Sequence, residues 1–226
     1  MDETEREAAK RSAGERAAEE LRDGDVVGLG TGSTAAHAIR ALGERVDSGL
    51  DVAGVATSYQ SADLAREVGI PLTTLDDTGV DVAIDGADQV AGTNAIKGGG
   101  GSHAREKVVD ASADRLLYVI DPTKEADALD RFVPVEVLPM ARSPVADAIA
   151  DLGGEPDLRS ASGKSGPVVT DNGNLLLDCA FGAIAEPERL AASLAGLPGV
   201  VEHGLFCGLA DALVVGGETA TLKPLS

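Results

Sequence analysis

The sequence predicts an α/β fold in which a Rossmann-like parallel sheet domain carries an inserted ferredoxin-like α+β domain. In residues 1–129, short apolar strands alternate with amphipathic helices, a pattern that favours a parallel sheet with helices on both faces. Between residues 130 and 206 the order of elements changes to βαββαβ, the split-βαβ arrangement of ferredoxin-like domains. Residues 207–226 are expected to return to the first domain.

The first domain is expected to open with a charged helix and then to repeat strand and helix units. Apolar residues at strand and helix spacing, with glycines at the ends of the runs, mark its elements. The expected strands are 25–30, 51–57, 70–75, 80–86 and 115–121, and the expected helices are 33–46, 58–69 and 102–113. A last apolar run, 211–217, is expected to add one more strand to this sheet.

The second domain begins where prolines become frequent, at Pro122, Pro134, Pro139 and Pro144. Its expected strands are 133–137, 156–160, 174–179 and 199–205, and its expected helices are 144–152 and 187–195. Asn172 and Gly173 form a turn dipeptide between apolar runs and predict a hairpin, while the polar segment 160–166 predicts a loop.

Composition indicates a globular chain that stays in the cytoplasm. With 226 residues and 43% hydrophobic content, the chain can bury a full core. It has no apolar run of about 18 residues, the length of a membrane span, and its charged N-terminal segment lacks the apolar centre of a signal peptide. Cys179 and Cys207 form no CxxC pair, which fits a reducing compartment.

Net charge excludes two classes of partner. The chain carries 38 acidic and 19 basic residues, a formal net charge of −19, so its surface repels nucleic acid phosphates and anionic membranes. The acids are dispersed and lysine is scarce, as on the surfaces of salt-adapted cytosolic proteins. We therefore interpret the charge as an adaptation to the environment.

A glycine-rich stretch, GLGTGST at Gly28–Thr34, lies between a predicted strand and a predicted helix. Its glycines permit close approach of a ligand to the backbone, and the free amides and hydroxyls suit a single phosphate. It lacks the GK[ST] ending of a P-loop, and Ser33 stands at the third glycine position of GxGxxG, so neither nucleotide motif is met. A simple capped turn is the alternative interpretation.

Two further strand ends carry candidate site residues. In DGAD, Asp85 closes a strand and Asp88 follows it, although aspartate before glycine is also common in turns. In IKGGGGSHAREK, four glycines separate Lys97 from a helix that carries Glu106. A turn needs one or two glycines, whereas a loop that folds its amides around a ligand can use all four.

Taken together, GLGTGSTAAHAI, IDGAD, IKGGGG followed by REK, RFVPVEVLPMARS and VTDNGN resemble the ribose-5-phosphate isomerase family of the A type, in order and approximate spacing along nearly the whole chain. The resemblance implies interconversion of ribose 5-phosphate and ribulose 5-phosphate, with a sugar phosphate as substrate and no metal or organic cofactor. It also implies a homodimer or a homotetramer.

The resemblance further implies roles for individual residues. Glu106 matches the family's catalytic base, which would move a proton from C2 to C1 through an enediolate, and Lys97 would stabilise the charge that develops on oxygen. Asp85 and Asp88 would orient hydroxyls or assist ring opening. The implied substrate-binding residues are Lys10, Thr31, Gly32, Ser33, Thr34, Asp85, Gly86, Ala87, Asp88, Lys97, Gly98, Gly99, Gly100 and Lys124.

The sequence departs from the family's pattern at two places. Gln89 stands where the family usually has glutamate, and Gly101, Ser102 and His103 replace a more apolar segment before REK. Both changes are expected to alter loop packing, and neither removes a proposed catalytic group.

Two other functions remain open from the residues alone. Asp85, Asp88 and Glu106 could form an oxygen-rich Mg²⁺ site of a phosphohydrolase, which a chelator would inactivate. A non-catalytic sensor of sugar phosphates could use the same fold, since fold does not fix function. The three histidines, His37, His103 and His203, are too scattered along the chain to predict a metal cluster.

Overall fold

The computed structural model describes residues 1–225, which form two compact units. Unit 1 comprises residues 1–87, 105–125 and the C-terminal segment from Leu209. Unit 2 comprises residues 88–104 and 126–208. The second domain expected from the sequence, residues 130–206, is close to the larger piece of unit 2, residues 126–208. Residues 88–104, which the sequence analysis includes in the first domain, form the smaller piece of unit 2.

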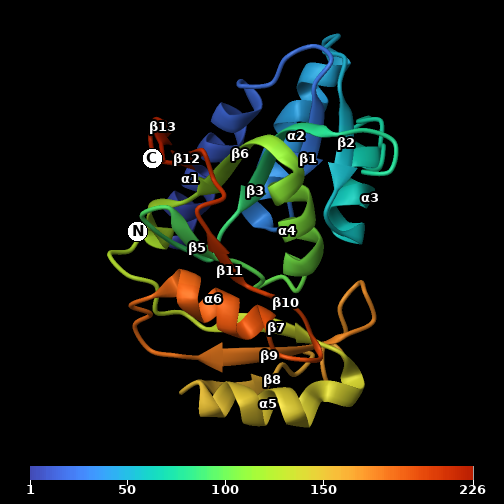
Figure 1. The fold of residues 1–226 in the computed structure, drawn as a ribbon. Coiled ribbons are helices and arrows are strands. Elements are labelled where there is room, and N and C mark those ends of the chain that lie inside the picture. The colour runs from blue at the N-terminus through green and yellow to red at the C-terminus, as the bar shows by residue number, and fades with distance from the viewer. Residues whose placement is uncertain (226) are drawn as a thin grey trace. The chain divides into compact units, whose positions relative to one another are not determined.

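Unit 1 is built on a six-stranded sheet with the order β13-β12-β6-β3-β1-β2, which is parallel except for the β12–β13 hairpin (Figure 1). Its strands are β1 (Val26–Leu29), β2 (Ala53–Ala56), β3 (Val80–Gly86), β6 (Ala113–Ile120), β12 (Ala212–Val215) and β13 (Thr221–Pro224). Its helices are α1 (Glu3–Ala18), α2 (Ser33–Asp47), α3 (Tyr59–Glu67) and the 3₁₀ turn η1 (Pro122–Lys124), and α4 (His103–Ser112) enters it from the segment 88–104.

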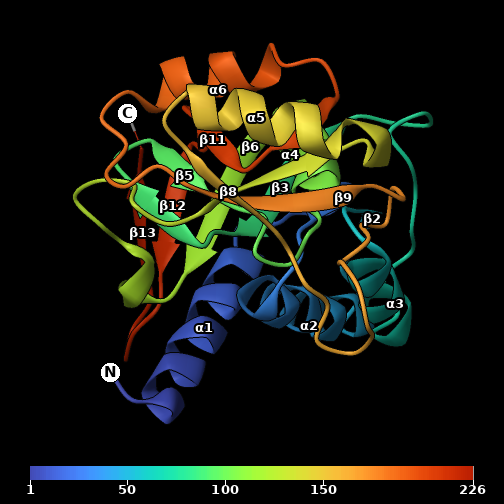
Figure 2. The same cartoon turned by 90° about the horizontal axis from the view of Figure 1, so that it is seen from below.

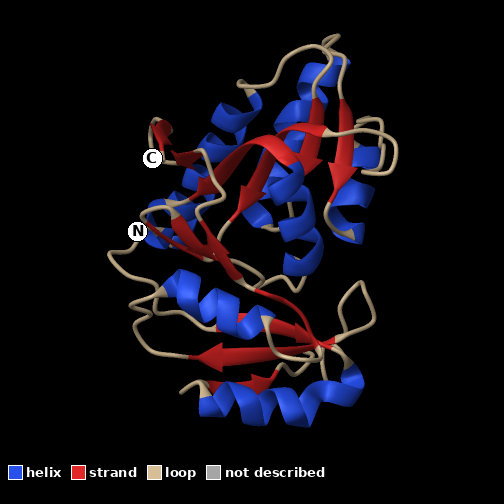
Figure 3. Ribbon diagram, viewed as in Figure 1, coloured by secondary structure: helices blue, strands red, loops and turns tan. Residues whose placement is uncertain are grey.

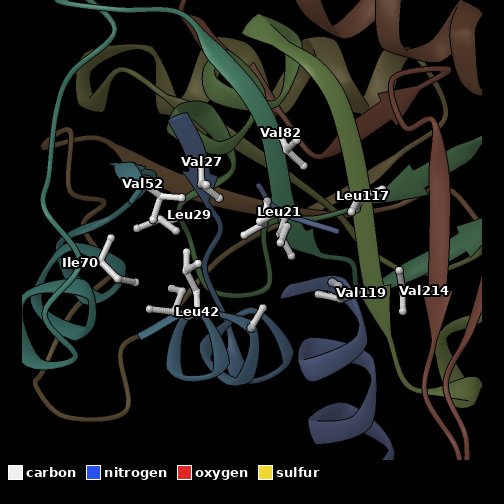
Figure 4. Packing of buried hydrophobic residues seen from close by; sticks show 14 of the residues in the cluster. Leu21, Val27, Leu29, Leu42, Val52, Ile70, Val82, Leu117, Val119 and Val214 are labelled. Atoms are coloured by element: carbon white, nitrogen blue, oxygen red, sulfur yellow. The ribbon is translucent and has the colours of Figure 1, made fainter. Parts of the chain in front are cut away.

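Both faces of this sheet are covered, as the alternation of side chains along β1 shows. Val27 and Leu29 belong to the core cluster that α1 and α2 complete, and Figure 4 shows them packed with Leu42 and Val82. Gly28 faces the opposite way, where a Cβ atom would lie 2.8 Å from Val109 of α4. Because successive strand residues point to opposite faces, the near-continuous apolar runs of these strands follow from burial on both sides.

The N-terminal helices pack closely against each other. Asp2 and Glu5 form a capping box that begins α1, and α1 lies next to α2 (Figure 2). A Cβ atom at Gly14 of α1 would lie 2.5 Å from the backbone nitrogen of Ala38 in α2. The absence of a side chain at Gly14 therefore lets the first turns of α2 approach α1.

Unit 2 contains a four-stranded antiparallel sheet with the order β10-β7-β9-β8 and a three-stranded sheet with the order β11-β5-β4. The first sheet has the ferredoxin-like order expected from the sequence. Its strands are β7 (Val133–Val137), β8 (Glu155–Leu158), β9 (Leu175–Ala180) and β10 (Val200–His203), and its helices are α5 (Arg142–Asp151), α6 (Pro187–Ala195) and the 3₁₀ turn η2 (Pro139–Ala141). The small sheet consists of β4 (Gln89–Ala91), β5 (Asn94–Ile96) and β11 (Leu205–Cys207).

Most predicted elements are confirmed, and Figure 3 shows their alternation. The predicted strand 70–75 is wrong, because this segment forms only one isolated bridge, between Gly54 and Leu72. The predicted strand 199–205 is divided between β10 and β11. Gly204 lies at the division, where its N–H donates to Pro134 O (2.7 Å) and its carbonyl accepts from Lys97 N (2.9 Å). Within residues 1–225, none of the helices is both long and apolar enough to cross a membrane.

Candidate active site

The glycine-rich loop after β1 is shaped by Asp85 at the end of β3. A Cβ atom at Gly30 would lie 2.6 Å from the Asp85 Cα atom, so the loop can pass there only without a side chain. Gly32 then adopts a φ of 115°, and α2 begins at Ser33. The first amides of a helix lack intrahelical partners and carry the positive end of the helix dipole, so this helix start can bind an anion.

Asp85 is fully buried and holds this loop through hydrogen bonds. Its Oδ1 atom accepts from Thr31 N (3.1 Å) and from Gly86 N (2.7 Å). Backbone amides that donate to a carboxylate make stronger bonds than neutral pairs. Within unit 1 the structure therefore brings Thr31, Asp85 and Gly86 together, as the strand-end positions of the two motifs predict.

A hydroxyl network lies next to Thr31, and the sequence did not predict it. The Thr31 Oγ1 atom lies 2.8 Å from Thr57 Oγ1 and 2.7 Å from Ser58 Oγ, and Thr57 Oγ1 also donates to Leu29 O (3.0 Å). Thr57 and Ser58 are both buried. Their one local signal is that Ser58 caps α3, which indicates a helix start and says nothing of Thr31.

Two polar contacts link Lys10 to helix α2. Its Nζ atom is 3.3 Å from Glu7 Oε2, and Glu7 Oε1 is 2.7 Å from Nε2 of His37, which lies one turn into α2. The hydrogen bond from His37, with a smaller contribution from Lys10, lowers the pKa of Glu7. Lys10 is thus linked through Glu7 to His37, a residue of the helix whose start can bind an anion. Lys124, the last residue of η1, is half-buried.

Glu106 lies in the first turn of α4, and its side chain is only 4% exposed. Asp110, one turn further along α4, is also buried. Glu106 therefore combines burial with a position immediately after the glycine run.

The glycine run itself forms a tight turn in unit 2. Gly101 N donates to Gly98 O (3.0 Å), and these two residues adopt φ values of 82° and 101°, a region that L-residues rarely adopt. Gly99 N donates to Asp88 Oδ2 (2.7 Å), and a Cβ atom at Gly99 would lie 2.7 Å from Asp88 Oδ1. Three of the four glycines are thus required by backbone geometry or by close approach.

Lys97 is placed at the start of this turn with a buried side chain, 2% exposed. Its Nζ atom lies 5.2 Å from the centre of the Phe206 ring, within the range of a cation–π contact. Within unit 2 the structure therefore brings together Lys97, Gly98 and Gly99 with Asp88. Thr31–Thr34, Asp85, Glu106, Lys10 and Lys124 belong to unit 1.

An arginine that the sequence did not predict contacts the same turn. Arg159 Nη1 donates to Gly98 O (3.0 Å) and to Gly99 O (3.1 Å), while its Nε and Nη2 atoms donate to the two carboxylate oxygens of Asp178 (2.8 and 2.5 Å). Arg159 lies about 60 residues beyond the glycines, so no local spacing could indicate the contact. A hollow of about 570 Å³ in unit 2 is lined by Asp88, Gly99, Asp130, Arg131, Phe132, Pro134, Arg159 and Asp178.

Both departures from the family's pattern are buried in unit 2. Gln89 donates to Asp130 Oδ1 (2.7 Å), and its Oε1 atom accepts from the backbone nitrogens of Asp130 and Arg131 (2.9 and 3.1 Å). The His103 ring packs against Gly98, where a Cβ atom would lie 2.7 Å from Nδ1, and its Nε2 atom lies 3.2 Å from Glu202 O. Among residues 1–225, the structure contains no group of three or more histidine, cysteine and acidic side chains placed to hold a metal ion.

Unit 1 thus has a helix start suited to an anion and buried carboxylates at strand and helix ends, and unit 2 has a buried lysine beside a glycine turn. Such features are typical of α/β enzymes that act on small anionic substrates. The family model described as ribose 5-phosphate isomerase A (phosphoriboisomerase A) matches residues 53–220. The chain belongs to this family.

Individual proteins show the same relationship over nearly the whole chain. A ribose-5-phosphate isomerase A from Haloarcula marismortui is 65% identical over 221 residues, covering 97% of each chain. The structure of ribose 5-phosphate isomerase A from Methanocaldococcus jannaschii matches with a TM-score of 0.92 at 41% identity, covering 96% of this chain and 98% of that one. A ribose-5-phosphate isomerase in complex with phospho-erythronic acid matches with a TM-score of 0.95 at 37% identity, covering 99% and 100%.

Proposed function

We propose that Glu106 is the general base of an aldose–ketose isomerisation. The observation that carries the proposal is the buried carboxylate of Glu106 in the first turn of α4, directly after the glycine run. The chain is a ribose-5-phosphate isomerase that interconverts D-ribose 5-phosphate and D-ribulose 5-phosphate. This reaction moves a proton between adjacent carbons, and one positioned carboxylate can accept it from C2 and return it to C1.

The enediolate formed between the two proton transfers needs stabilisation of its negative charge. Lys97 supplies a buried ammonium group, and we assign the backbone amide of Gly100, in the turn after it, as a second donor, since the amides of Gly99 and Gly101 bind Asp88 and Gly98. Asp85 and Asp88 accept backbone N–H bonds that fix their carboxylates, and we assign them to the substrate hydroxyls and to ring opening. This chemistry uses acid–base and electrostatic catalysis alone, without a metal or an organic cofactor.

The phosphate is assigned to the start of α2. Thr31, Gly32, Ser33 and Thr34 present amides and hydroxyls there. The contacts that link Lys10 through Glu7 to His37 of the same helix support a role for Lys10 in binding the phosphate. Lys124 adds a third lysine to the proposed substrate site. On a chain of net charge −19 these lysines would locally reverse a field that otherwise repels a phosphorylated sugar.

The ligand of one similar structure supports the proposed charge stabilisation. Phospho-erythronic acid, bound in the isomerase that is 37% identical, combines a phosphate with a carboxylate. A planar carboxylate has the shape and charge of an enediolate end, so the same acid should bind this chain as a stable anion that resembles the intermediate.

The test is the Glu106→Gln variant, which keeps the size of the side chain and removes its basicity. After exhaustive chelation, we expect turnover to fall roughly 10² to 10⁴-fold, and exchange of the C2 proton with solvent deuterium to fall in parallel. Binding of phospho-erythronic acid should persist. Glu44→Gln, on an exposed face of α2, is the matched control and should turn over at the wild-type rate.

Near wild-type turnover of Glu106→Gln would exclude Glu106 as the base and make Asp85 or Asp88 the leading candidate. Loss of wild-type activity on chelation would instead favour a metal-dependent enzyme. Binding of ribose 5-phosphate by folded wild-type protein without any ketose formed would favour a sensor.

We also infer a homo-oligomer, a dimer or a tetramer, in the cytoplasm. Unit 2 exposes large apolar side chains at Phe132 (63%), Met140 (89%) and Val201 (42%), which a second copy could cover. Cys179 and Cys207 are not joined in a disulfide, which supports a reducing compartment. Sedimentation in high salt tests the assembly, and a monomer at micromolar concentration would contradict it.

A further inference from the structure

We propose that Arg159, held by Asp178, is a positioning residue that presents the backbone amide of Gly100, in the glycine turn, to the substrate. The inference deepens the proposed function, because it assigns to unit 2 the control of a loop that binds the sugar. Arg159 contacts two consecutive carbonyls of that loop with one guanidinium nitrogen, Nη1.

The peptide unit between Gly98 and Gly99 is held at both ends. Its carbonyl accepts from Arg159, and its N–H donates to Asp88 Oδ2. A trans peptide is planar, with its carbonyl and N–H on opposite sides, so two contacts fix the orientation of the whole unit. The carboxylate of Asp88 is oriented by the same contact.

The next peptide unit, between Gly99 and Gly100, is held by its carbonyl alone. Because Arg159 binds Gly99 O, planarity directs the Gly100 N–H to the side away from the guanidinium. A cation on the carbonyl oxygen also polarises the peptide and strengthens its N–H as a donor. Arg159 therefore orients and activates a donor of the kind that stabilises an oxyanion.

Asp178 fixes the guanidinium. Nε and Nη2 make a two-point contact with its two oxygens, a geometry that lysine cannot reproduce. The side chains are only 16% and 27% exposed, which limits screening by solvent. Arg159 itself is anchored in the backbone next to β9, since its nitrogen donates to Leu176 O (2.9 Å) and its carbonyl accepts from Val168 N (2.8 Å).

A run of four glycines makes this external support necessary. Glycine loses more backbone freedom on ordering than any other residue, so an unsupported run would sample many conformations and would have to be ordered by the substrate. A loop that is already held in its binding conformation avoids that loss at the moment of binding. Arg159, which directly follows β8, holds the loop in this way through its hydrogen bonds to Gly98 O and Gly99 O.

The experiment compares Arg159→Ala, Arg159→Lys and Asp178→Asn by steady-state kinetics and by binding of phospho-erythronic acid, with thermal melting as the check of folding. We expect Arg159→Ala to raise KM for ribose 5-phosphate about 10-fold and to weaken phospho-erythronic acid about 100-fold, because the planar anion depends more on the oriented amide. On a logarithmic scale, Arg159→Lys should lose more than half as much affinity for ribose 5-phosphate and for phospho-erythronic acid as Arg159→Ala does. Asp178→Asn should fall between the wild type and Arg159→Ala.

Arg189→Ala is the matched control. Arg189 is an exposed arginine of the same unit, paired with Glu186 at 2.9 Å, and its removal should change neither constant. Wild-type KM and wild-type affinity for the acid in folded Arg159→Ala would overturn the proposal, as would an equal loss in Arg189→Ala. Failure of Arg159→Ala, Arg159→Lys and Asp178→Asn to fold would also overturn the proposal, because Arg159 and Asp178 would then be needed for folding and not for the orientation of the loop.

The Arg159 experiment and the Glu106 experiment can fail independently of each other. If Glu106→Gln turns over at the wild-type rate while Arg159→Ala loses affinity, the assignment of the base fails and the positioning role stands. If Glu106→Gln loses turnover while Arg159→Ala keeps both constants, the base stands and the positioning role fails.

Discussion

Replacement of Gly30 by alanine tests how the loop after β1 and the buried Asp85 depend on each other. The new methyl group would lie 2.6 Å from the Asp85 Cα atom and closer still to its carboxylate, whereas ordinary carbon contacts begin near 3.4 Å. Overpacking of this kind typically costs about 1–3 kcal/mol. Moving Asp85 away would instead break its bonds from Thr31 N and Gly86 N, and hydrogen bonds to a charged group contribute about 1.5–3 kcal/mol each.

We therefore expect Gly30→Ala to lower the free energy of unfolding by about 3 kcal/mol and kcat/KM by at least about 10²-fold, since loop and carboxylate shift together. Urea unfolding and initial rates in high salt measure the two effects. Gly79→Ala is the control for the substitution itself, because no atom lies within 4 Å of its added Cβ, and it should stay within about 0.5 kcal/mol of the wild type.

Gly32→Ala separates crowding from backbone strain. Gly32 also has no atom within 4 Å of an added Cβ, but its φ of 115° strains an L-residue by about 1–2 kcal/mol. A Gly30→Ala variant as stable and as active as Gly79→Ala would refute the coupling between the loop and Asp85. A loss in Gly32→Ala with none in Gly30→Ala would show that strain, and not overlap with Asp85, controls the loop, because only Gly32 of the two has a positive φ.

Three further predictions follow from buried groups and from charge. Burial and the charge of Asp178 raise the pKa of Cys179 to about 12, so at pH 8 only roughly one Cys179 thiol in 10⁴ is ionised. Iodoacetamide should therefore label Cys207 first and Cys179 only on unfolding, and equal labelling rates in the native protein would contradict this. Gln89→Glu should lower the free energy of unfolding by about 2 kcal/mol, because the Gln89 side chain that the new carboxylate replaces lies 2.7 Å from Asp130 Oδ1. Adding Asp130→Asn to this variant should recover most of the loss in urea unfolding, and additive losses would argue against the contact. The melting temperature should rise steadily toward molar KCl, since salt screens repulsion within a chain of net charge −19, and a melting temperature indifferent to salt would show that the charge is no such adaptation.

The sequence predicts the parallel sheet well because its strands are buried on both faces. Val82, Ala83 and Ile84 form an unbroken apolar run that periodicity detects at once. The segment 70–75 contains apolar and β-branched residues but makes only one bridge, at Leu72, so residue type alone overestimates its pairing. β4 and β5 have three residues each, too few for any period to be visible.

The contacts of the candidate site, like these short strands, are predicted from the sequence only where a pattern along the chain indicates them. Thr31 and Asp85 could be placed together because both follow parallel strands, whose carboxyl ends share one edge of the sheet. The contacts of Thr31 with Thr57 and Ser58, and of Arg159 with the glycine turn, join segments with no shared pattern. Such contacts depend on tertiary packing, and a single sequence contains no periodic signal for them.

The division of unit 2 into two pieces of chain has a consequence during synthesis. β5 is complete at residue 96, but its partner β11 ends at residue 207, and Arg159 also follows the glycine turn by about 60 residues. At a translation rate of about 5–20 residues per second, the turn emerges roughly 5 to 20 s before the last strand that its unit requires. During that interval, four flexible glycines and the apolar edge of β5 remain without their partners. The glycine turn therefore reaches its final environment only after β11 has been made.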